Sequence, residues 1–196
     1  MSDILTQEVL AQLFTEARTH NGWQDKPVSP ELLKQAWDIA KWDSTSANAS
    51  PLRVVFISGK AAKDRLVEAV SDGNKLKTAS APVTAIIAHD PKFYDQLPKL
   101  FPHADARSWF TSSEALANET AFRNGSLQAA YFIIALRSLG LDTGPMSGFD
   151  AAEVEKRFLS EKGWKVNFLV NIGYGDPAKL FERLPRLSFD EATLTL

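Results

Sequence analysis

The sequence predicts an α+β fold in which helices surround a small central sheet. Helical patterns outnumber strand-like ones, and three short apolar runs at 53–58, 82–88 and 166–175 have the character of strands. A long helical pattern at 113–138 is apolar all round in its second half and is expected to be buried. A chain of 196 residues is long enough to bury such a core, so we expect one domain over residues 1–196.

The first third of the chain predicts two helices. Apolar residues recur at helical spacing over 3–17, which indicates an amphipathic helix, and the sequence RTHNGW at 18–23 ends it. Ser29 then supplies a capping hydroxyl, with Pro30 and an acidic residue in the first turn. The second helix is therefore expected from this cap to about Trp42.

The middle of the chain predicts the first two strands. RVVFIS at 53–58 is expected as a strand, 60–71 as a helix, and PVTAIIA at 82–88 as a buried strand. Three prolines interrupt any long helix over 91–112, which we expect to be mixed in structure.

The long helix at 113–138 and a third strand complete the expected fold. Gly140 ends the helix, and GPMSGFD at 144–150 is expected as a loop because it holds two glycines and a proline. A short helix at 151–159 and a strand at 166–175 follow.

Composition excludes several classes of function. A net charge of −2 leaves no broad cationic surface for nucleic acid, and the absence of Cys excludes disulfides and thiolate chemistry. The apolar run 129–136 is far shorter than a membrane span, and the first residues do not resemble a secretory signal, so we expect a cytoplasmic protein that does not bind membranes. His20, His89 and His103 lack metal-ligand spacing, so no metal site is expected.

One glycine motif is interpreted as a decoy. GYGDPA at 173–178 matches the G-x-G-x-x-A pattern and follows a strand, but a dinucleotide-binding fold needs a further helix and strand after it. Only 18 residues follow Ala178, and Pro177 crowds the turn.

Small polar residues between the second helix and the first strand raise a different possibility. The stretch KWDSTSANASPLRVVF at 41–56 could simply cap a helix and form turns. However, cations with neutral hydrogen-bonding neighbours occur elsewhere, at Arg18, Lys77 and Arg183. Three cations and many amides and hydroxyls suit a phosphate that is attached to a polar heterocycle.

These segments, taken in order, resemble the nitroreductase-like flavoprotein family. The resemblance runs from Arg-Thr at 18–19 through Ser-Thr-Ser-Ala-Asn at 44–48, Asn74 with Lys77, and Ser-Gly-Phe-Asp at 147–150 to Arg183. It implies a nitroreductase-like fold, bound FMN with NADH or NADPH as hydride donor, and an intertwined homodimer with two flavin sites at its interface.

The resemblance also implies individual cofactor contacts. Arg18 and Arg183 would hold the phosphate, and Thr19 and His20 lie in the same turn as Arg18. Thr45, Ser46 and Asn48 would reach the flavin of the opposite subunit. Asn74 and Lys77 would meet the flavin ring, with Lys77 at its N1–C2=O edge, and Ser147 and Gly148 would face N5. Ala17, Ser50 and Leu52 depart from residues that are common in the family.

More narrowly, ARSWFTSS, TAFRN, GLDTGPMSGFD and NIGYGD with RLPRLSF resemble the reductases of malonic semialdehyde in bacterial uracil degradation. This implies NAD(P)H-dependent reduction of the aldehyde to 3-hydroxypropionate. The alternatives are a broad-specificity nitroreductase or quinone reductase of the same fold, and a flavin-binding protein with little turnover. The residues identify no catalytic acid or base.

A substrate with a carboxylate needs a cation beyond those assigned to the cofactor. Arg107 is the candidate, with Trp109 and Phe110 as aromatic residues that would exclude water above the ring. The alternative is that Arg107 forms a surface ion pair while both aromatic residues belong to the core.

Overall fold

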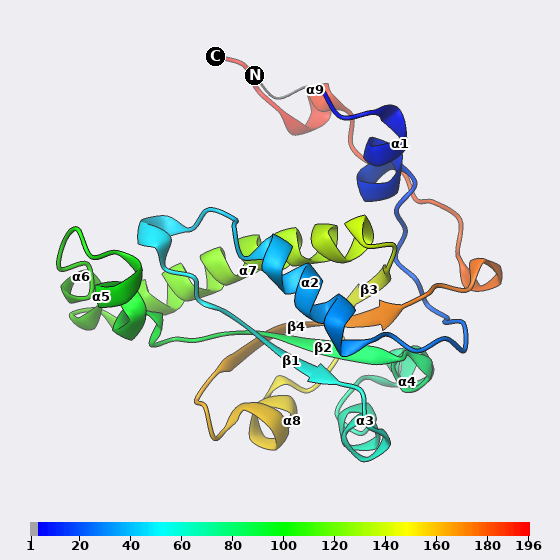
Figure 1. Ribbon diagram of the computed structural model, residues 1–196, viewed down its shortest axis with the longest axis horizontal. Coiled ribbons are helices and arrows are strands. Elements are labelled where there is room, and N and C mark those ends of the chain that lie inside the picture. The colour runs from blue at the N-terminus through cyan, green and yellow to red at the C-terminus, as the bar shows by residue number, and fades with distance from the viewer. Residues whose placement is uncertain (1–3) are drawn as a thin grey trace.

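The structure is a computed structural model that describes residues 4–196 and contains a central antiparallel sheet (Figure 1). Within this range the sheet has four strands in the order β1-β2-β4-β3. Their bounds are β1 Leu52–Ile57, β2 Val83–His89, β3 Asp142–Met146 and β4 Lys165–Gly173. Each neighbouring pair is antiparallel. The observed α+β architecture confirms the predicted fold class.

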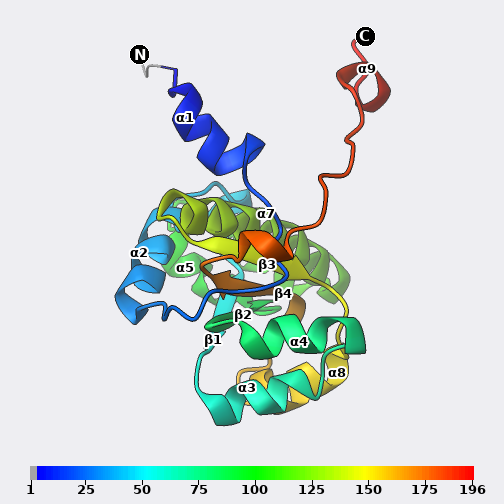
Figure 2. The same cartoon turned by 90° about the vertical axis from the view of Figure 1, so that its right-hand side faces the viewer.

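Helices cover both faces of this sheet (Figures 1 and 2). On one face lie α2 (Pro30–Ala40) and α7 (Glu114–Ser138), and on the other lie α3 (Lys60–Val67), α4 (Asp72–Ser80) and α8 (Ala151–Val154). Because successive strand residues face opposite sides, Ile87 packs in the core below α7 while Ile86 packs in the core beside α3.

The long helix α7 confirms the expected helix at 113–138. Ser113 caps its start by accepting a hydrogen bond from the Leu116 backbone N–H at 3.3 Å, and Gly140, with φ of 75°, follows its end. Phe132 and Leu136 in its second half are completely buried as predicted, but Leu127 and Tyr131 in the same half are 45% and 47% exposed, so the expectation that this half is buried all round holds only for the face toward the sheet.

The other expected helices are present with changed bounds. Ser29 caps α2 through the Leu32 backbone N–H. The first expected helix is shorter than 3–17, with α1 over Gln7–Leu10 and a π-helical segment η1 over Ala11–Thr15, and its residue 3 lies outside the described range. The expected helix at 151–159 is α8 followed by the π-helical segment η4 (Glu155–Leu159).

Two elements differ from the sequence expectation. The expected loop at 144–150 begins inside strand β3, where Pro145 is tolerated because β3 is an edge strand that pairs only with β4 among the described strands. The expected helix at 60–71 ends early at Val67, and a separate helix α4 follows it. The mixed segment 91–112 holds η3 (Phe93–Gln96), α5 (Leu97–Leu100) and α6 (Ser108–Thr111).

Both terminal segments extend away from the sheet and its helices as separate arms (Figure 2). The carboxyl-terminal arm includes the 3-10 turn η5 (Pro177–Lys179) and α9 (Phe189–Ala192), and its apolar residues Phe181 and Leu184 are each 74% exposed. In the part of the chain that is described, none of the helices is both long enough and apolar enough to span a bilayer.

Candidate functional site

A cationic cavity of about 570 Å³ lies where the two terminal segments meet. Residues from 14–21 and 181–186 line it together with Arg137 from the last turn of α7. Arg18, Arg137, Arg183 and Arg186 all contribute to this lining, whereas Glu182 is the acidic residue among them. The positive charge and guanidinium donors favour binding of an anion such as phosphate.

Two reciprocal hydrogen bonds join the walls of this cavity. Arg183 donates through Nη2 to the carbonyl of Ala17 at 3.1 Å, and Arg18 donates through Nη2 to the carbonyl of Phe181. Each guanidinium has five N–H donors, so both retain donors for a ligand. The structure therefore brings together the arginines that the sequence analysis placed 165 positions apart.

Arg137 is a cavity residue that the sequence analysis missed. Its Nη1 donates to the Leu13 carbonyl at 3.1 Å, while its buried Nε has no hydrogen-bond partner within residues 4–196. Burial lowers the pKa of Arg137, although the nearby Asp142 carboxylate opposes this shift. A cation in the last turn of a helix is expected from the helix dipole alone. The position of Arg137 in the sequence therefore did not indicate that it lines a ligand cavity.

His20 turns away from the cavity and contacts Asp142 instead. Its Nε2 lies 3.2 Å from Asp142 Oδ1, and the Gly175 backbone N–H donates to Asp142 Oδ2 at 2.8 Å. Burial raises the pKa of Asp142, but these hydrogen bonds, together with nearby positive charge such as that of Arg137, outweigh burial and the pKa is lowered overall. The side chain of His20 thus anchors the Arg18–Thr19 turn to the sheet rather than lining the cavity.

The contact with His20 also explains the decoy glycine motif. A Cβ atom on Gly175 would lie 1.8 Å from His20 Nδ1, and one on Gly173 would lie 2.7 Å from Pro82 Cδ. Both glycines are therefore needed for packing. In the described chain, no strand follows Gly173, so the dinucleotide-binding arrangement is excluded as the sequence analysis expected.

A second group of candidate residues gathers at α4. Asn74 Nδ2 donates to the Gly148 carbonyl at 2.8 Å, and a Cβ atom on Gly148 would lie only 2.6 Å from this nitrogen. Lys77 lies one turn further along α4, and Ser147 precedes Gly148 in the facing segment. The structure thus places these four predicted residues beside one another.

Lys77 links this group to the cavity. Its Nζ lies 3.4 Å from Oδ1 of Asn21, which is itself a cavity-lining residue, and its carbonyl accepts a hydrogen bond from Trp23 Nε1 at 3.0 Å. Burial lowers the pKa of the Lys77 ammonium group. The turn at 18–21, α4 and the segment 147–148 consequently form one continuous region.

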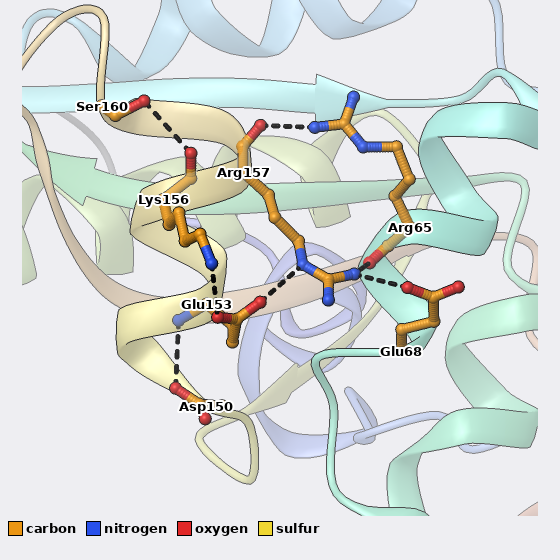
Figure 3. A network of polar contacts seen from close by, with 7 residues as sticks. All are labelled: Arg65, Glu68, Asp150, Glu153, Lys156, Arg157 and Ser160. Atoms are coloured by element: carbon orange, nitrogen blue, oxygen red, sulfur yellow. Dashed lines mark hydrogen bonds and ion pairs between the residues drawn. The ribbon is translucent and has the colours of Figure 1, made fainter.

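A polar network fixes the segment that follows Gly148 (Figure 3). Arg65 of α3 and Arg157 of η4 each donate to the carbonyl of the other, at 2.7 and 2.9 Å. Arg157 also contacts Glu68 at 2.6 Å and Glu153 at 2.9 Å. These contacts hold α3 against α8 and η4, and the Ser71 backbone N–H just before α4 donates to the Gly148 carbonyl at 3.0 Å.

In a single chain, Thr45, Ser46 and Asn48 lie far from the cationic cavity and from α4. The Ser46 backbone N–H donates to Asn124 Oδ1 at 2.9 Å, and Asn48 Nδ2 donates to the Leu100 carbonyl at 2.9 Å. Asn124 and Arg137 are 13 residues apart on α7, which is roughly 20 Å along the helix axis. One chain therefore does not bring the predicted residues at 45–48 to the cationic cavity.

The loop around these residues adopts an uncommon backbone. Ala47, Asn48 and Ser50 have φ values of 50°, 50° and 42°, in the left-handed region that non-glycine residues rarely occupy. Thr45 Oγ1 accepts a hydrogen bond from the Ser50 N–H at 3.2 Å, which stabilises the turn. Such strained loops occur often at ligand-binding sites.

The candidate substrate residues lie beside this strained loop rather than beside the cavity. Arg107 Nε contacts Asp95 Oδ1 at 2.9 Å, and Trp109, 49% exposed, packs against Phe101 with ring centroids 6.0 Å apart. Phe110 is 7% exposed and packs with Phe93 in an apolar cluster. Arg107 therefore forms an ion pair and Phe110 belongs to the core, as the alternative to substrate binding predicted. Trp109 differs from that alternative, because it stays accessible.

Comparisons with known proteins identify the fold and the family. The sequence profile of the nitroreductase family matches residues 14–174. A nitroreductase family protein from Streptococcus pneumoniae TIGR4 superposes with a TM-score of 0.83 at 22% identity, covering 95% of this chain and 100% of that one. These values establish a shared fold.

Two further solved structures, one of them with FMN bound, share this fold. A candidate nitroreductase from Exiguobacterium sibiricum, solved in complex with FMN, has a TM-score of 0.85 at 16% identity, with complete coverage of both chains. A candidate NAD(P)H:FMN oxidoreductase from Staphylococcus epidermidis has a TM-score of 0.83 at 14% identity, again with complete coverage.

Proposed function

Because this chain belongs to the nitroreductase family, we propose that it is an FMN-dependent oxidoreductase that uses NADH or NADPH. The observation that carries the proposal is the cavity lined by Arg18, Arg137 and Arg183, with Lys77 beside it. When bound, FMN supplies the hydride-transfer chemistry. The protein residues bind it, orient it and set the local charge.

The residues present fit FMN in chemical type. Arg18 and Arg183 would hold its phosphate with the guanidinium donors that their carbonyl contacts leave free, and Arg137, which also lines the cavity, adds the terminal N–H donors that its contact with Leu13 leaves free. Lys77 would offer a cation to the polar edge of the ring, where reduction adds negative charge. The amide of Asn74 and the backbone at Ser147 and Gly148 would satisfy ring polar atoms.

A homodimer would complete this site. The residues at 45–48 and 107–109 lie at the other end of α7 from the cavity, so a second copy is needed to bring them to the same cofactor. Apolar residues that a partner could cover are exposed on the carboxyl-terminal arm and on α7, including Phe181, Leu184, Phe122 and Tyr131. We expect an interface above about 2,000 Å², the range of obligate dimers.

Mixed dimers test this arrangement. Arg18→Ala removes a phosphate ligand, and Asn48→Gly removes an amide while it keeps the left-handed backbone that glycine tolerates. If each site uses both chains, a dimer of one Arg18→Ala and one Asn48→Gly chain has one intact site and regains flavin-dependent activity. If the residues act within one chain, both sites stay damaged and no activity returns.

The substrate that we propose is malonic semialdehyde, reduced to 3-hydroxypropionate in pyrimidine degradation. This proposal rests on the sequence resemblance and on a cation, Arg107, beside the accessible Trp109. Asp95 already pairs with Arg107, so a substrate carboxylate would have to displace it. That ion pair favours the second candidate, reduction of uncharged quinones or nitro compounds, which need no such cation.

Steady-state oxidation of NADH and NADPH by the FMN-loaded protein distinguishes these activities. We expect the highest kcat/KM with malonic semialdehyde. Higher values with quinones or nitroaromatic compounds would instead identify the broad-specificity reductase. Flavin binding without oxidation in the presence of any electrophile would identify a binding protein.

A further inference from the structure

Lys63 on α3 is a buried cation that the candidate site does not use. Its side chain is almost fully buried, with the residue 6% exposed, and its Nζ donates to Thr84 Oγ1 at 2.7 Å. Within residues 4–196 no carboxylate forms an ion pair with it. A buried ammonium group with a neutral partner is costly, so its presence calls for a role other than stability.

Lys63 begins a chain of buried hydrogen bonds that runs along one face of the sheet, from β2 to β4 and on to α4. Thr84 Oγ1 donates to Asn171 Oδ1 at 2.7 Å, and Asn171 Nδ2 donates to Thr78 Oγ1 at 3.5 Å. Thr78 Oγ1 in turn donates to the Met146 sulfur at 3.6 Å. Because an ammonium group only donates, it fixes the direction of each hydrogen bond after it.

The chain ends at α4, the helix that carries Asn74 and Lys77. Within α4, all of which is described, Thr78 is the buried residue, so a polar side chain rather than an apolar one seats this helix. The last two hydrogen bonds are long and therefore weak. The contact of Thr78 with the sheet depends on Asn171, because the Asn171 amide can donate to Thr78 only in the orientation that its hydrogen bond from Thr84 sets.

We propose that Lys63 is a positioning residue for Lys77, because its buried ammonium group fixes the direction of the hydrogen-bond chain that seats α4 on the sheet. The link between Lys63 and α4 stands on these contacts alone. The consequence for activity rests on the proposed function, since Lys77 matters there as a cofactor ligand.

Deprotonation of Lys63 should change the hydrogen-bond chain, so the chain should depend on pH. Burial lowers the pKa of Lys63 to about 8. The neutral amine both donates and accepts, so above this pH the Thr84 hydroxyl is free to turn toward Lys63 and release Asn171. The charged residues on the surrounding elements pair elsewhere: Lys60 with Asp64, Asp72 with Lys75, Arg53 with Asp90, and Lys165 with Glu155. Lys77 on α4 contacts Asn21.

Hydrogen exchange of α4 tests the structural link. The amides of residues 72–80 are compared with those of α7 at pH 7 and pH 9.5, after correction for intrinsic exchange, in wild type, Lys63→Met and Thr84→Val. Lys60→Met is the matched control, because Lys60 lies one turn away on the same helix with its side chain 87% exposed.

We expect the exchange of α4 relative to α7 to rise roughly 3- to 10-fold in Lys63→Met and Thr84→Val at pH 7, the effect of one lost hydrogen bond. In wild type and Lys60→Met, the exchange of α4 relative to α7 should increase between pH 7 and pH 9.5, by less than the substitutions cause. Lys63→Met should show no such increase with pH. Unchanged α4 exchange in Lys63→Met would overturn the inference.

The pH profile of kcat/KM for the FMN-loaded protein adds a readout that a purely structural role would not change. Wild type and Lys60→Met should show an inflection near pH 8 that is absent in Lys63→Met. If the inflection persists in Lys63→Met, the link to Lys77 is wrong. A protein that binds no FMN but shows the expected exchange would refute the proposed function and support the connection between Lys63 and α4.

Discussion

Arg183 near the carboxyl terminus donates a hydrogen bond of 3.1 Å to the carbonyl of Ala17 near the amino terminus. Both residues line the cationic cavity, and the contact leaves other guanidinium donors of Arg183 available. The two terminal segments thus form the anion-binding wall together, and binding should depend on both.

Arg183→Ala should weaken FMN binding by about 1.5–3 kcal/mol, the range for a hydrogen bond to a charged group. Titration of FMN into apoprotein, followed by quenching of flavin fluorescence, measures the change. Glu182→Gln is the control, because it removes the acidic group of the lining and should leave binding equal or tighter. Unchanged affinity in Arg183→Ala would exclude this residue as a phosphate ligand.

Substitution of Arg137 should separate ligand binding from stability. Arg137→Met removes a partly buried guanidinium together with its hydrogen bond from Nη1 to the Leu13 carbonyl, so the apoprotein should lose about 1.5–3 kcal/mol of unfolding free energy and its Tm should fall accordingly. The rise in Tm that FMN produces should shrink, because ligand stabilisation follows affinity. Thermal unfolding with and without FMN measures both. An equal FMN-induced rise in variant and wild type would mean that Arg137 does not contact the cofactor.

Lys63 should make stability depend on alkaline pH. The pKa of Lys63 is about 8 in the folded protein and about 10.5 when unfolded, so between these values the unfolded chain binds more protons. The free energy of unfolding of wild type should therefore rise by about 3 kcal/mol relative to Lys63→Met as the pH increases from 8 to 10.5. Local opening of α4 is a separate process, because Lys63 can stay buried during it.

Urea denaturation at several pH values measures this difference between wild type and Lys63→Met. A difference that does not change with pH would show that Lys63 keeps its ordinary pKa in the folded protein. Lys60→Met, with an exposed side chain, should follow the wild-type curve.

Glycine substitutions should test the contact between His20 and the sheet. Gly175→Ala places a Cβ atom 1.8 Å from His20 Nδ1 and should destabilise the protein by about 1–3 kcal/mol or more. Gly73→Ala on α4 has no atom within 4 Å of the added Cβ and should stabilise the protein by up to about 1 kcal/mol. Urea denaturation compares the two. Equal effects would contradict the described position of His20.

Two aromatic residues of one short helix should respond differently. Phe110→Ala removes a core side chain that packs on Phe93 and should cost about 3–5 kcal/mol of unfolding free energy. Trp109→Ala should cost less, because Trp109 is half exposed, but should raise KM if it covers the substrate. Chemical denaturation and steady-state kinetics separate these effects. Greater destabilisation by Trp109→Ala would contradict the described packing.

Much of the fold was predictable because the spacing of apolar residues follows from which residues are buried. The apolar second half of α7 and the apolar strand β2, in which Ile86 and Ile87 face two different cores, are examples. Strand β3 was not predictable in this way. Gly144 and Pro145 disfavour a strand by propensity, and only its edge position in the sheet makes them acceptable.

The site was predictable in part for a related reason. Arg18 and Arg183 stood out as cations in polar surroundings, and the structure brings them to one cavity. Helix α4 lacks an apolar period because Thr78 seats it through hydrogen bonds, which no sequence pattern records. The inward turn of His20 likewise depends on Asp142 and Gly175, which lie far along the chain.

Analysis of the flavin that the purified protein carries tests the central claim most directly. The protein is heated, the released cofactor is separated by chromatography, and its amount is compared with the protein concentration. We predict FMN, close to one per chain, in wild type and a large loss of FMN when Arg18 and Arg183 are both replaced by alanine. Release of FAD, or failure of the apoprotein to bind FMN, would contradict the assignment of the cationic cavity as a site for the FMN phosphate.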